Sequence, residues 1–189
     1  MRRKSERTRQ KIIEAAYAMF YRKGFARVSI DAIAARAGVT KRTLYGYFRS
    51  KDDLLEAAFV HYSARDRERL KVIGARLPKK PDAMLDDFFG QLVGWAATPR
   101  WTGSGFTRAV VELADLPGHP ARAIARRAKA ATEAWLADLL AREKVRLPRE
   151  RAREVMLLME GAMALMLIHG DRSYGSAAAR AAKRLLKSK

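Results

Sequence analysis

Cysteine is absent from this sequence of 189 residues, so disulfide bonds, cysteine-ligated zinc sites and thiol nucleophiles are excluded. Long hydrophobic runs are absent too. The longest nearly uncharged stretch, residues 161–170, has about half of the roughly 20 residues that a membrane-spanning helix requires. The amino terminus has no apolar core of the kind found in secretory signals. These absences predict a cytoplasmic protein that does not cross a membrane.

Acidic residues are scarce, because 20 Asp and Glu accompany 39 Lys and Arg, which gives a formal net charge of +19. The excess is concentrated in residues 1–51, which hold 14 basic and 3 acidic side chains, a net charge of +11. Hydrophobic residues make up 49% of the chain, enough to build a buried core. A basic terminal block is typical of a nucleic-acid-binding surface, a membrane-surface patch or a solvated tail, and composition alone leaves all three open.

Catalytic signatures are also missing. The chain has no Gly-x-Ser-x-Gly, Gly-x-x-x-x-Gly-Lys or His-Glu-x-x-His motif. The acid pairs 52–53 and 86–87 are adjacent in sequence, so their side chains diverge on a helix and do not share a site. The three histidines, His61, His119 and His169, are too scattered to suggest a metal site. We therefore expect neither an enzyme nor a metalloprotein, and no cofactor.

Apolar residues recur at three- and four-residue steps along most of the chain, which predicts an all-α fold of about nine helices. Ser29, Thr40 and Ser50 are suited to cap helix starts, and Gly24 and Gly38 are suited to end helices. The expected helices cover residues 8–23, 30–37, 41–48, a segment from 51 onward, 82–97, 106–114, 120–142, 149–168 and 176–186.

The second and third expected helices are short and joined by a turn that contains Gly38, which is the helix-turn-helix arrangement. On the third helix Leu44 and Phe48 share the face that would pack inward. The opposite face carries side chains suited to the major groove, where arginine can donate two hydrogen bonds to guanine. Gly46 lies on that outer face, either to let the helix approach the bases or to relieve crowding between two tyrosines.

Residues 30–34 and 38–55, which read IDAIA and GVTKRTLYGYFRSKDDLL, resemble the TetR/AcrR family of bacterial transcription regulators. The resemblance is specific over about residues 8–60. It implies a three-helix helix-turn-helix DNA-binding domain at residues 5–64. Residues 65–189 would then form a helical domain for effector binding and dimerisation.

The resemblance implies base contacts from Lys41, Arg42 and Thr43, with phosphate contacts around them. Position 47 is most often histidine in the family, and the tyrosine found here can also donate to a phosphate. Gly46 replaces a residue that is usually aromatic or polar, which removes one base contact. The expected DNA-binding residues are Ser29, Thr40, Lys41, Arg42, Thr43, Tyr45, Tyr47 and Lys51.

The resemblance further implies a homodimer and a cavity for a small apolar or aromatic effector. Core packing within one chain is the alternative interpretation of both apolar sets. The expected dimer interface contains Val155, Leu158, Met159, Ala162, Met163 and Met166. The expected cavity lining contains Phe59, Tyr62, Phe88, Leu92, Trp95, Phe106, Val110 and Trp135.

Together these features predict a ligand-responsive homodimeric regulator, expected to be a repressor, that binds a pseudo-palindromic operator and is released by a small molecule. The alternative is a nonspecific basic nucleic-acid-binding or architectural protein without an inducer. The Gly-Val-Thr turn at residues 38–40 favours the regulator, because a protein that binds by charge alone does not need it.

Overall fold

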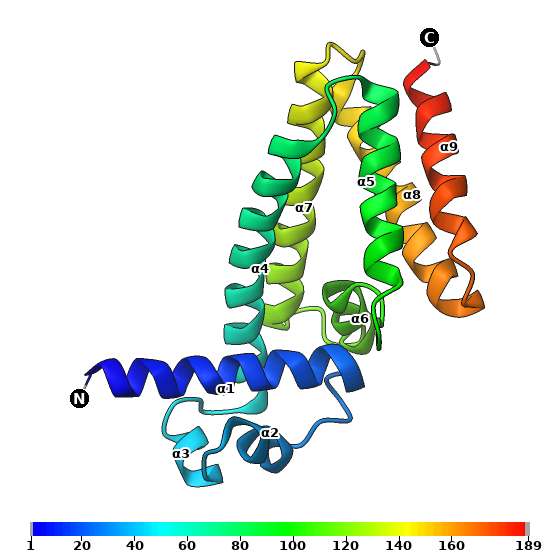
Figure 1. Cartoon of the computed structure of the whole chain (residues 1–189). Coiled ribbons are helices and arrows are strands. Elements are labelled where there is room, and N and C mark those ends of the chain that lie inside the picture. Colours follow the sequence, from blue (N-terminus) through cyan, green and yellow to red (C-terminus); the bar gives the residue numbers. More distant parts are fainter. Residues whose placement is uncertain (1, 188–189) are drawn as a thin grey trace. The chain divides into compact units, whose positions relative to one another are not determined.

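The structure is a computed structural model that describes residues 2–187. Across these residues the chain forms nine α-helices and no β-strand, as the sequence pattern predicted (Figure 1). The helices divide between two compact units. Unit 1 holds the described residues up to Asp66 together with Gly105–Arg127, and unit 2 holds Arg67–Ser104 together with the described residues from Ala128 onward. None of the helices within residues 2–187 is long and apolar enough to span a membrane.

Unit 1 contains four complete helices and parts of two longer ones. Its elements are α1 (Arg2–Lys23), α2 (Ile30–Ala37), α3 (Lys41–Tyr45), the first part of α4 (Lys51–Arg76), α6 (Gly105–Glu112) and the start of α7 (Pro120–Arg142). Unit 2 contains the remainders of α4 and α7 and three complete helices. These are α5 (Pro81–Ala96), α8 (Pro148–His169) and α9 (Ser173–Lys187).

The predicted starts of α2, α3 and α4 are confirmed by hydrogen bonds from backbone N–H groups to capping hydroxyls. Each bond satisfies a donor that the first helical turn leaves without an intrahelical partner. The pairs are Ala32 N to Ser29 Oγ at 3.2 Å, Thr43 N to Thr40 Oγ1 at 3.1 Å and Asp53 N to Ser50 Oγ at 3.0 Å.

Two glycines end helices as predicted. Gly24 follows α1 with φ +87° and Gly38 follows α2 with φ +68°, in the left-handed region where a side chain would add strain. The Gly38 N–H closes the last turn of α2 by bonding the carbonyls of Ala34 and Ala35. These caps hold the helix-turn-helix of unit 1 to a short, defined turn.

Several helix boundaries differ from the prediction, and two of these differences lie in the helices around the helix-turn-helix. α1 begins at Arg2, whereas apolar periodicity placed its start at Thr8, because its first turns are polar and carry no apolar stripe. α3 ends at Tyr45, whereas the prediction extended it to Phe48. Gly46 caps α3 by donating from its N–H to the carbonyls of Arg42 and Thr43, in keeping with the low helix propensity of glycine.

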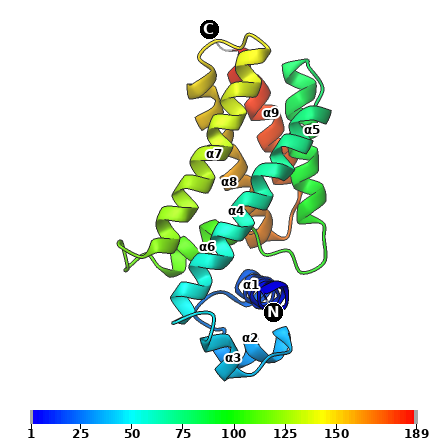
Figure 2. The ribbon, with the colours of Figure 1, turned by 90° about the vertical axis from the view of Figure 1, so that its left-hand side faces the viewer.

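The core of unit 1 lies where α1, α2, α3 and α4 meet (Figures 1 and 2). Leu44 and Phe48 are buried, as the third-helix pattern predicted, and the guanidinium of Arg9 lies 5.2 Å from the centre of the Phe48 ring. This packing leaves the opposite side of α3 accessible. The side chains that form this core include Ile12, Ala16, Ile33, Leu44, Phe48, Leu54 and Leu55.

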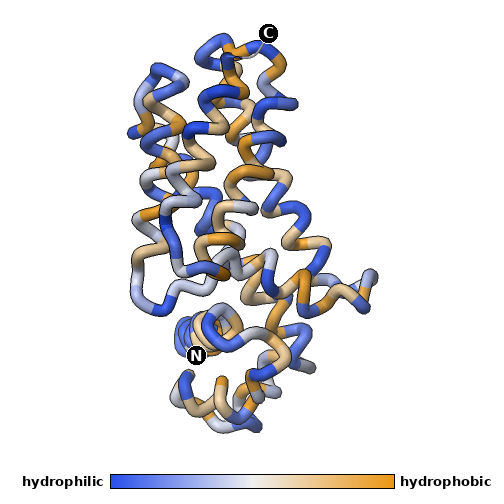
Figure 3. Tube along the Cα trace, turned by 90° about the vertical axis from the view of Figure 1, so that its right-hand side faces the viewer, coloured by the Kyte–Doolittle hydropathy of each residue, from blue (hydrophilic) through white to orange (hydrophobic). Residues whose placement is uncertain are grey.

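The core of unit 2 is built where α5, α8 and α9 pack together. The tube in Figure 3 changes between hydrophobic and hydrophilic colours within single helical turns, as expected of helices that bury one face. Gly175 of α9 allows α5 and α9 to pack closely, because a Cβ at this position would collide with Val93 of α5. Leu85, Leu136, Leu140 and Val155 are among the side chains that this packing buries completely.

Candidate functional site

The outer face of α3 carries an exposed set of polar and basic side chains. Leu44 has no exposed surface, whereas Tyr45 next to it is 46% exposed and Lys41 and Arg42 are also exposed. The alternation follows from the helix period, since one side of α3 packs on α2. The predicted base-contacting residues therefore lie on an accessible surface of unit 1.

Hydrogen bonds within unit 1 hold parts of this surface in place. Lys41 Nζ donates to Asp31 Oδ2 of α2 at 3.1 Å, and both side chains are more than half exposed. The Thr40 and Thr43 hydroxyls lie 2.8 Å apart. A hydroxyl that accepts one bond can still donate its proton, so the α2 cap Ser29 keeps a donor for a phosphate oxygen. Thr40 and Thr43 use one hydroxyl proton between them, so one of the two keeps a donor.

Tyr47 lies at the junction between α3 and α4. Its hydroxyl is 3.1 Å from the Ser5 hydroxyl near the start of α1, across 42 residues of sequence. The bond fixes the direction of the Tyr47 side chain. Gly46 precedes it, and a Cβ added at Gly46 would lie 3.2 Å from the carbonyl oxygen of Thr43, so glycine relieves crowding at the end of α3.

Lys51, the first residue of α4, lies against the turn between α1 and α2. Its ammonium group donates to the carbonyl of Ala26 at 3.4 Å and sits 4.3 Å from the centre of the Phe25 ring. Burial lowers the pKa of Lys51, while the nearby carboxylates of Asp52 and Glu112 act in the opposite direction. An ammonium carries three donors, so this arrangement leaves donors for a phosphate.

The predicted effector-binding residues occur in both units, where ring contacts group them. In unit 1 the Phe59 and Phe106 rings meet edge to face at 4.8 Å, and Tyr62 stacks on Tyr17. Burial raises the pKa of both tyrosines above their usual value. Val110 of α6 is partly exposed.

In unit 2 the remaining predicted lining residues also belong to aromatic clusters. Phe88 lies 6.0 Å from Trp135, and Trp95 lies 5.9 Å from Trp101 in an edge-to-face pair. Leu92 is buried in the same core. The indole Nε1 of Trp101 is buried and has no hydrogen-bond partner within the described residues.

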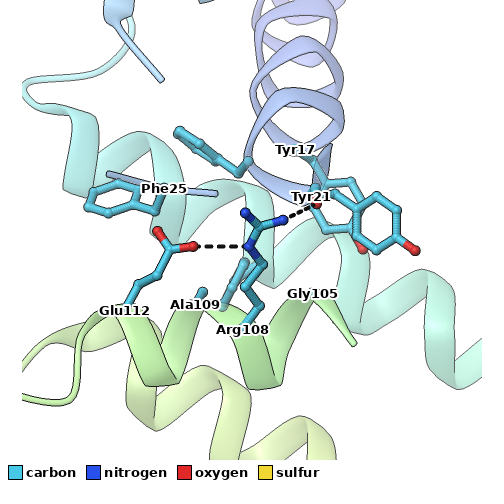
Figure 4. Close-up of a pocket in the computed structure, with 9 residues that line it drawn as sticks. Tyr17, Tyr21, Phe25, Gly105, Arg108, Ala109 and Glu112 are labelled. Atoms are coloured by element: carbon cyan, nitrogen blue, oxygen red, sulfur yellow. Dashed lines mark hydrogen bonds and ion pairs between the residues drawn. The ribbon is translucent and has the colours of Figure 1, made fainter. Parts of the chain in front are cut away.

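A small pocket lies within unit 1, next to α6 (Figure 4). It has room for about one water molecule, about 10 Å³, far below the several hundred Å³ of a cavity for a drug-sized ligand. Of the predicted lining residues only Phe59 contributes to it. Its lining consists of Tyr17, Phe20, Tyr21, Phe25, Phe59, Gly105, Arg108, Ala109 and Glu112.

Most of the predicted dimer-interface residues face the core of unit 2. Val155 has no exposed surface, Leu158 is partly buried, and the other four, Met159, Ala162, Met163 and Met166, are buried as well. A side chain without accessible surface cannot contact a partner chain. The protomer's own core therefore uses these five side chains, and their part in a dimer interface stays a prediction.

A second apolar stripe on α8 remains accessible. Leu157 and Ile168 are both 70% exposed, and the exposed small residues Gly161 and Ala164 lie between them. Their spacing of three and four residues puts all four on one side of the helix. We call these four residues the α8 stripe.

Several contacts around Lys51 were not predicted from the sequence. Arg108 and Glu112 of α6 bond to the end of α1 and the α1–α2 turn, and His119 packs near Phe25. Arg108 and Glu112 are four residues apart, the spacing of a helical ion pair, which occurs on many solvated helices. Nothing in the pattern indicated a contact with residues more than 80 positions away. Within residues 2–187 no cluster of His, Asp and Glu is suited to hold a metal ion.

Comparisons with known proteins bear on the same segment. Residues 12–58 match the family described as "Bacterial regulatory proteins, tetR family". The chain is 43% identical over 53 residues to the HTH-type transcriptional regulator TtgR of Pseudomonas putida, covering 28% of this chain and 25% of TtgR. It is 29% identical over 131 residues to the HTH-type transcriptional repressor SCO4008 of Streptomyces coelicolor, covering 65% and 64% of the two chains. The chain spans about a quarter of the length of several curated relatives that it matches.

The likeness to solved structures extends over most of the chain. The crystal structure of SCO4454, a TetR-family transcriptional regulator from Streptomyces coelicolor, matches with a TM-score of 0.82 and 25% sequence identity. The match covers 96% of this chain and 95% of that one. The matched family segment contains α2, the turn at Gly38 and α3 with its exposed face. Residues 12–58 therefore match the TetR family of bacterial regulatory proteins, and most of the chain is similar to a solved TetR-family regulator.

Proposed function

We propose that this protein is a homodimeric, DNA-binding transcription regulator that reads an operator with α3. The observation that carries the proposal is the capped α2–turn–α3 unit, whose outer face is exposed and basic while its inner face is buried. An α-helix of this kind fits the major groove. Because its partner is chromosomal DNA, the protein acts in the cytoplasm.

In this proposal Arg42 reads a guanine, and Lys41 and Thr43 contact neighbouring bases. Thr40, Tyr45, Tyr47, Lys51 and Ser29 contact phosphates, which set the register of the helix without reading sequence. Residues 5–64 act as the DNA-binding domain, and residues 65–189 bind the effector and form the dimer.

The proposed dimer interface is the α8 stripe. An exposed apolar stripe of two large residues with small residues between them allows two helices to approach closely. The basic side chains Arg180 and Arg184 of α9 are exposed and would lie at the polar rim. A two-fold dimer presents two α3 helices to half-sites about 34 Å apart.

We further propose that a small apolar or aromatic effector releases the protein from DNA, so that it acts as a repressor. The aromatic side chains of unit 2 and the unpartnered indole N–H of Trp101 support an apolar ligand with a hydrogen-bond acceptor. The effector shifts the equilibrium only if its affinity differs between the free and the DNA-bound state. All three tryptophans lie in unit 2, so their fluorescence reports binding there.

Selection from a library of random DNA duplexes tests the proposed function. The expected result is enrichment of a two-fold symmetric sequence with half-sites one helical turn apart, about 10 base pairs. Uniform recovery with strong salt dependence would instead support the nonspecific basic nucleic-acid-binding protein. Titrating small aromatic compounds into the complex with the selected duplex then tests effector release.

A further inference from the structure

We propose that Glu112 is a positioning residue for DNA binding. Its carboxylate holds the peptide of Ala26, and the carbonyl of Ala26 orients the ammonium group of Lys51 toward a phosphate. This inference rests on the proposed function and adds to it a residue outside the helix-turn-helix.

Ala26 is held through both of its backbone groups. Its N–H donates to Glu112 Oε2 at 3.0 Å, and its carbonyl accepts from Lys51 Nζ at 3.4 Å. The carboxylate and the ammonium are therefore connected through a single residue of the turn. A shift of Ala26 away from Glu112 moves the carbonyl that orients Lys51.

The carboxylate is itself fixed by α6 and α1. Arg108 Nε donates to Glu112 Oε1 at 3.1 Å, and Arg108 Nη1 donates to the carbonyl of Tyr21 at 3.3 Å. Figure 4 shows the Arg108 side chain between Glu112 and Tyr21. The Arg108 and Glu112 side chains are 31% and 22% exposed, so solvent screens this pair less than a fully exposed one.

Gly24 makes this approach sterically feasible. The residue is buried with φ +87°, and a Cβ at this position would collide with Glu112 and lie 2.9 Å from Arg108 Nη2. The turn thus has no side chain where α6 presses against it. The adjacent Phe25 ring contributes a second contact for the ammonium of Lys51 at 4.3 Å.

The loop that follows α6 makes further contacts around Lys51. The His119 ring meets Phe25 at 6.3 Å, and its Nε2 lies 3.6 Å from Asp52 Oδ1, next to Lys51. Elements on both sides of Lys51 therefore press the α1–α2 turn against the start of α4. Among the described residues, Glu112 bonds the backbone N–H of Ala26 and Lys51 bonds its carbonyl.

The direction of the change in DNA affinity distinguishes a positioning role of Glu112 from an effect of its charge alone. Removing a carboxylate near a DNA-binding surface raises the net charge by one and, by electrostatics alone, tightens binding to DNA. Positioning predicts the opposite, because Lys51 loses its orientation. Glu112→Ala and Glu112→Gln change the charge equally, but glutamine keeps an oxygen that can accept from the Ala26 N–H.

The experiment measures binding of the full chain to a mixed-sequence duplex over a salt series, because a phosphate contact needs no particular sequence. Lys51→Ala and Glu112→Ala are each expected to make the slope of log affinity against log salt less steep by about 0.9 for each DNA-bound protomer. This corresponds to an about 3.5-fold smaller loss of affinity per protomer between 50 and 200 mM salt. Glu112→Gln is expected to keep the wild-type slope. Glu68→Ala removes an exposed carboxylate paired with Lys71 and serves as the charge control.

The double variant Glu112→Ala/Lys51→Ala is expected to show the slope of Lys51→Ala alone, because both changes remove the same contact. Circular dichroism melts confirm that each variant is folded at the temperature of the assay. An unchanged slope for Glu112→Ala beside a lowered slope for Lys51→Ala would overturn the inference while leaving the proposed function intact. A wild-type chain that binds no DNA would instead overturn the proposed function.

Discussion

Lys41, the first residue of α3, donates a hydrogen bond to Asp31 of α2 at 3.1 Å, so a predicted base-contacting cation is paired with a carboxylate in the free protein. Both side chains are more than half exposed, and such pairs contribute between about 0 and 1 kcal/mol to stability. In the proposed complex with DNA, Lys41 would exchange the carboxylate for a base or a phosphate. The pair therefore competes with binding more than it supports the fold.

Asp31→Asn is expected to tighten DNA binding, because it removes this competitor and one negative charge from the proposed interface. The melting temperature is expected to stay unchanged, since the pair is exposed. Equilibrium binding to the selected duplex measures the affinity, and Glu68→Ala controls for the change in net charge. Weaker binding by Asp31→Asn would show that Asp31 holds Lys41 in its productive direction.

Arg42→Ala is expected to lower specificity at one base pair of the operator. A bidentate arginine–guanine contact is worth about 1 to 3 kcal/mol of discrimination, so the variant should bind the cognate duplex and its single-site mutant nearly equally. The exposed Arg69 on α4 gives a matched variant of equal charge, Arg69→Ala. Equal weakening on all duplexes would assign Arg42 to a phosphate.

Leu157→Glu is expected to convert the proposed dimer to a monomer, because it places a charge within the proposed apolar contact. Sedimentation velocity at micromolar concentration measures the change. Leu116 lies in the connection between α6 and α7, is 49% exposed, and gives the control Leu116→Glu. Dimers that persist in Leu157→Glu would place the interface elsewhere.

Gly161 and Gly90 form a second matched pair for the same interface. Each lies on an exposed helix face, and an added Cβ meets nothing within 4 Å in the protomer. Alanine should stabilise either helix by up to about 1 kcal/mol. Gly90→Ala is expected to raise the melting temperature only, whereas Gly161→Ala should also weaken the dimer, because the α8 stripe needs a small residue there. Equal dimer dissociation constants for the two variants would contradict a close approach at Gly161.

Asp171 caps the start of α9 and should make stability depend on pH. The backbone N–H and the hydroxyl of Ser173 donate to its carboxylate and lower its pKa. Because the folded pKa lies below the unfolded value of about 3.9, the stabilisation is complete above that pH and is lost as the pH falls through the folded pKa. Thermal melts of Asp171→Ala should differ from wild type at neutral pH, and the difference should shrink below about pH 4. Asp171→Asn keeps an acceptor oxygen and should lose that pH dependence. A difference in melting temperature between Asp171→Ala and wild type that stays constant with pH would contradict the role of the carboxylate.

Local features of the fold were predictable from sequence because they depend on neighbours along the chain. The caps at Ser29, Thr40 and Ser50 each bond a residue three positions away. The end of α3 was placed too late because the apolar spacing of Leu44 and Phe48 outweighed the helix-ending tendency of Gly46.

Long-range features were not predictable in the same way. α8 is apolar on two sides, so its period alone could not decide whether Val155 or Leu157 faces the core, and packing against α5 and α9 made the choice. The contact of Glu112 with Ala26 spans 86 residues and depends on where α6 returns to the α1–α2 turn. The exposed basic face of α3 was partly predictable. The helix period shows which residues share a face, whereas the packing of unit 1 decides which face is buried.

The capping bonds that define α2, α3 and the start of α4 each close a loop of only three or four residues. Closing so short a loop costs little chain entropy, and elements with local contacts form quickly. Leu44 and Phe48 then complete their packing against α1, α2 and the first part of α4, which all precede α5 in the chain. During synthesis the segment that carries the proposed reading helix can therefore reach its native structure while α8 and α9 are still within the ribosome.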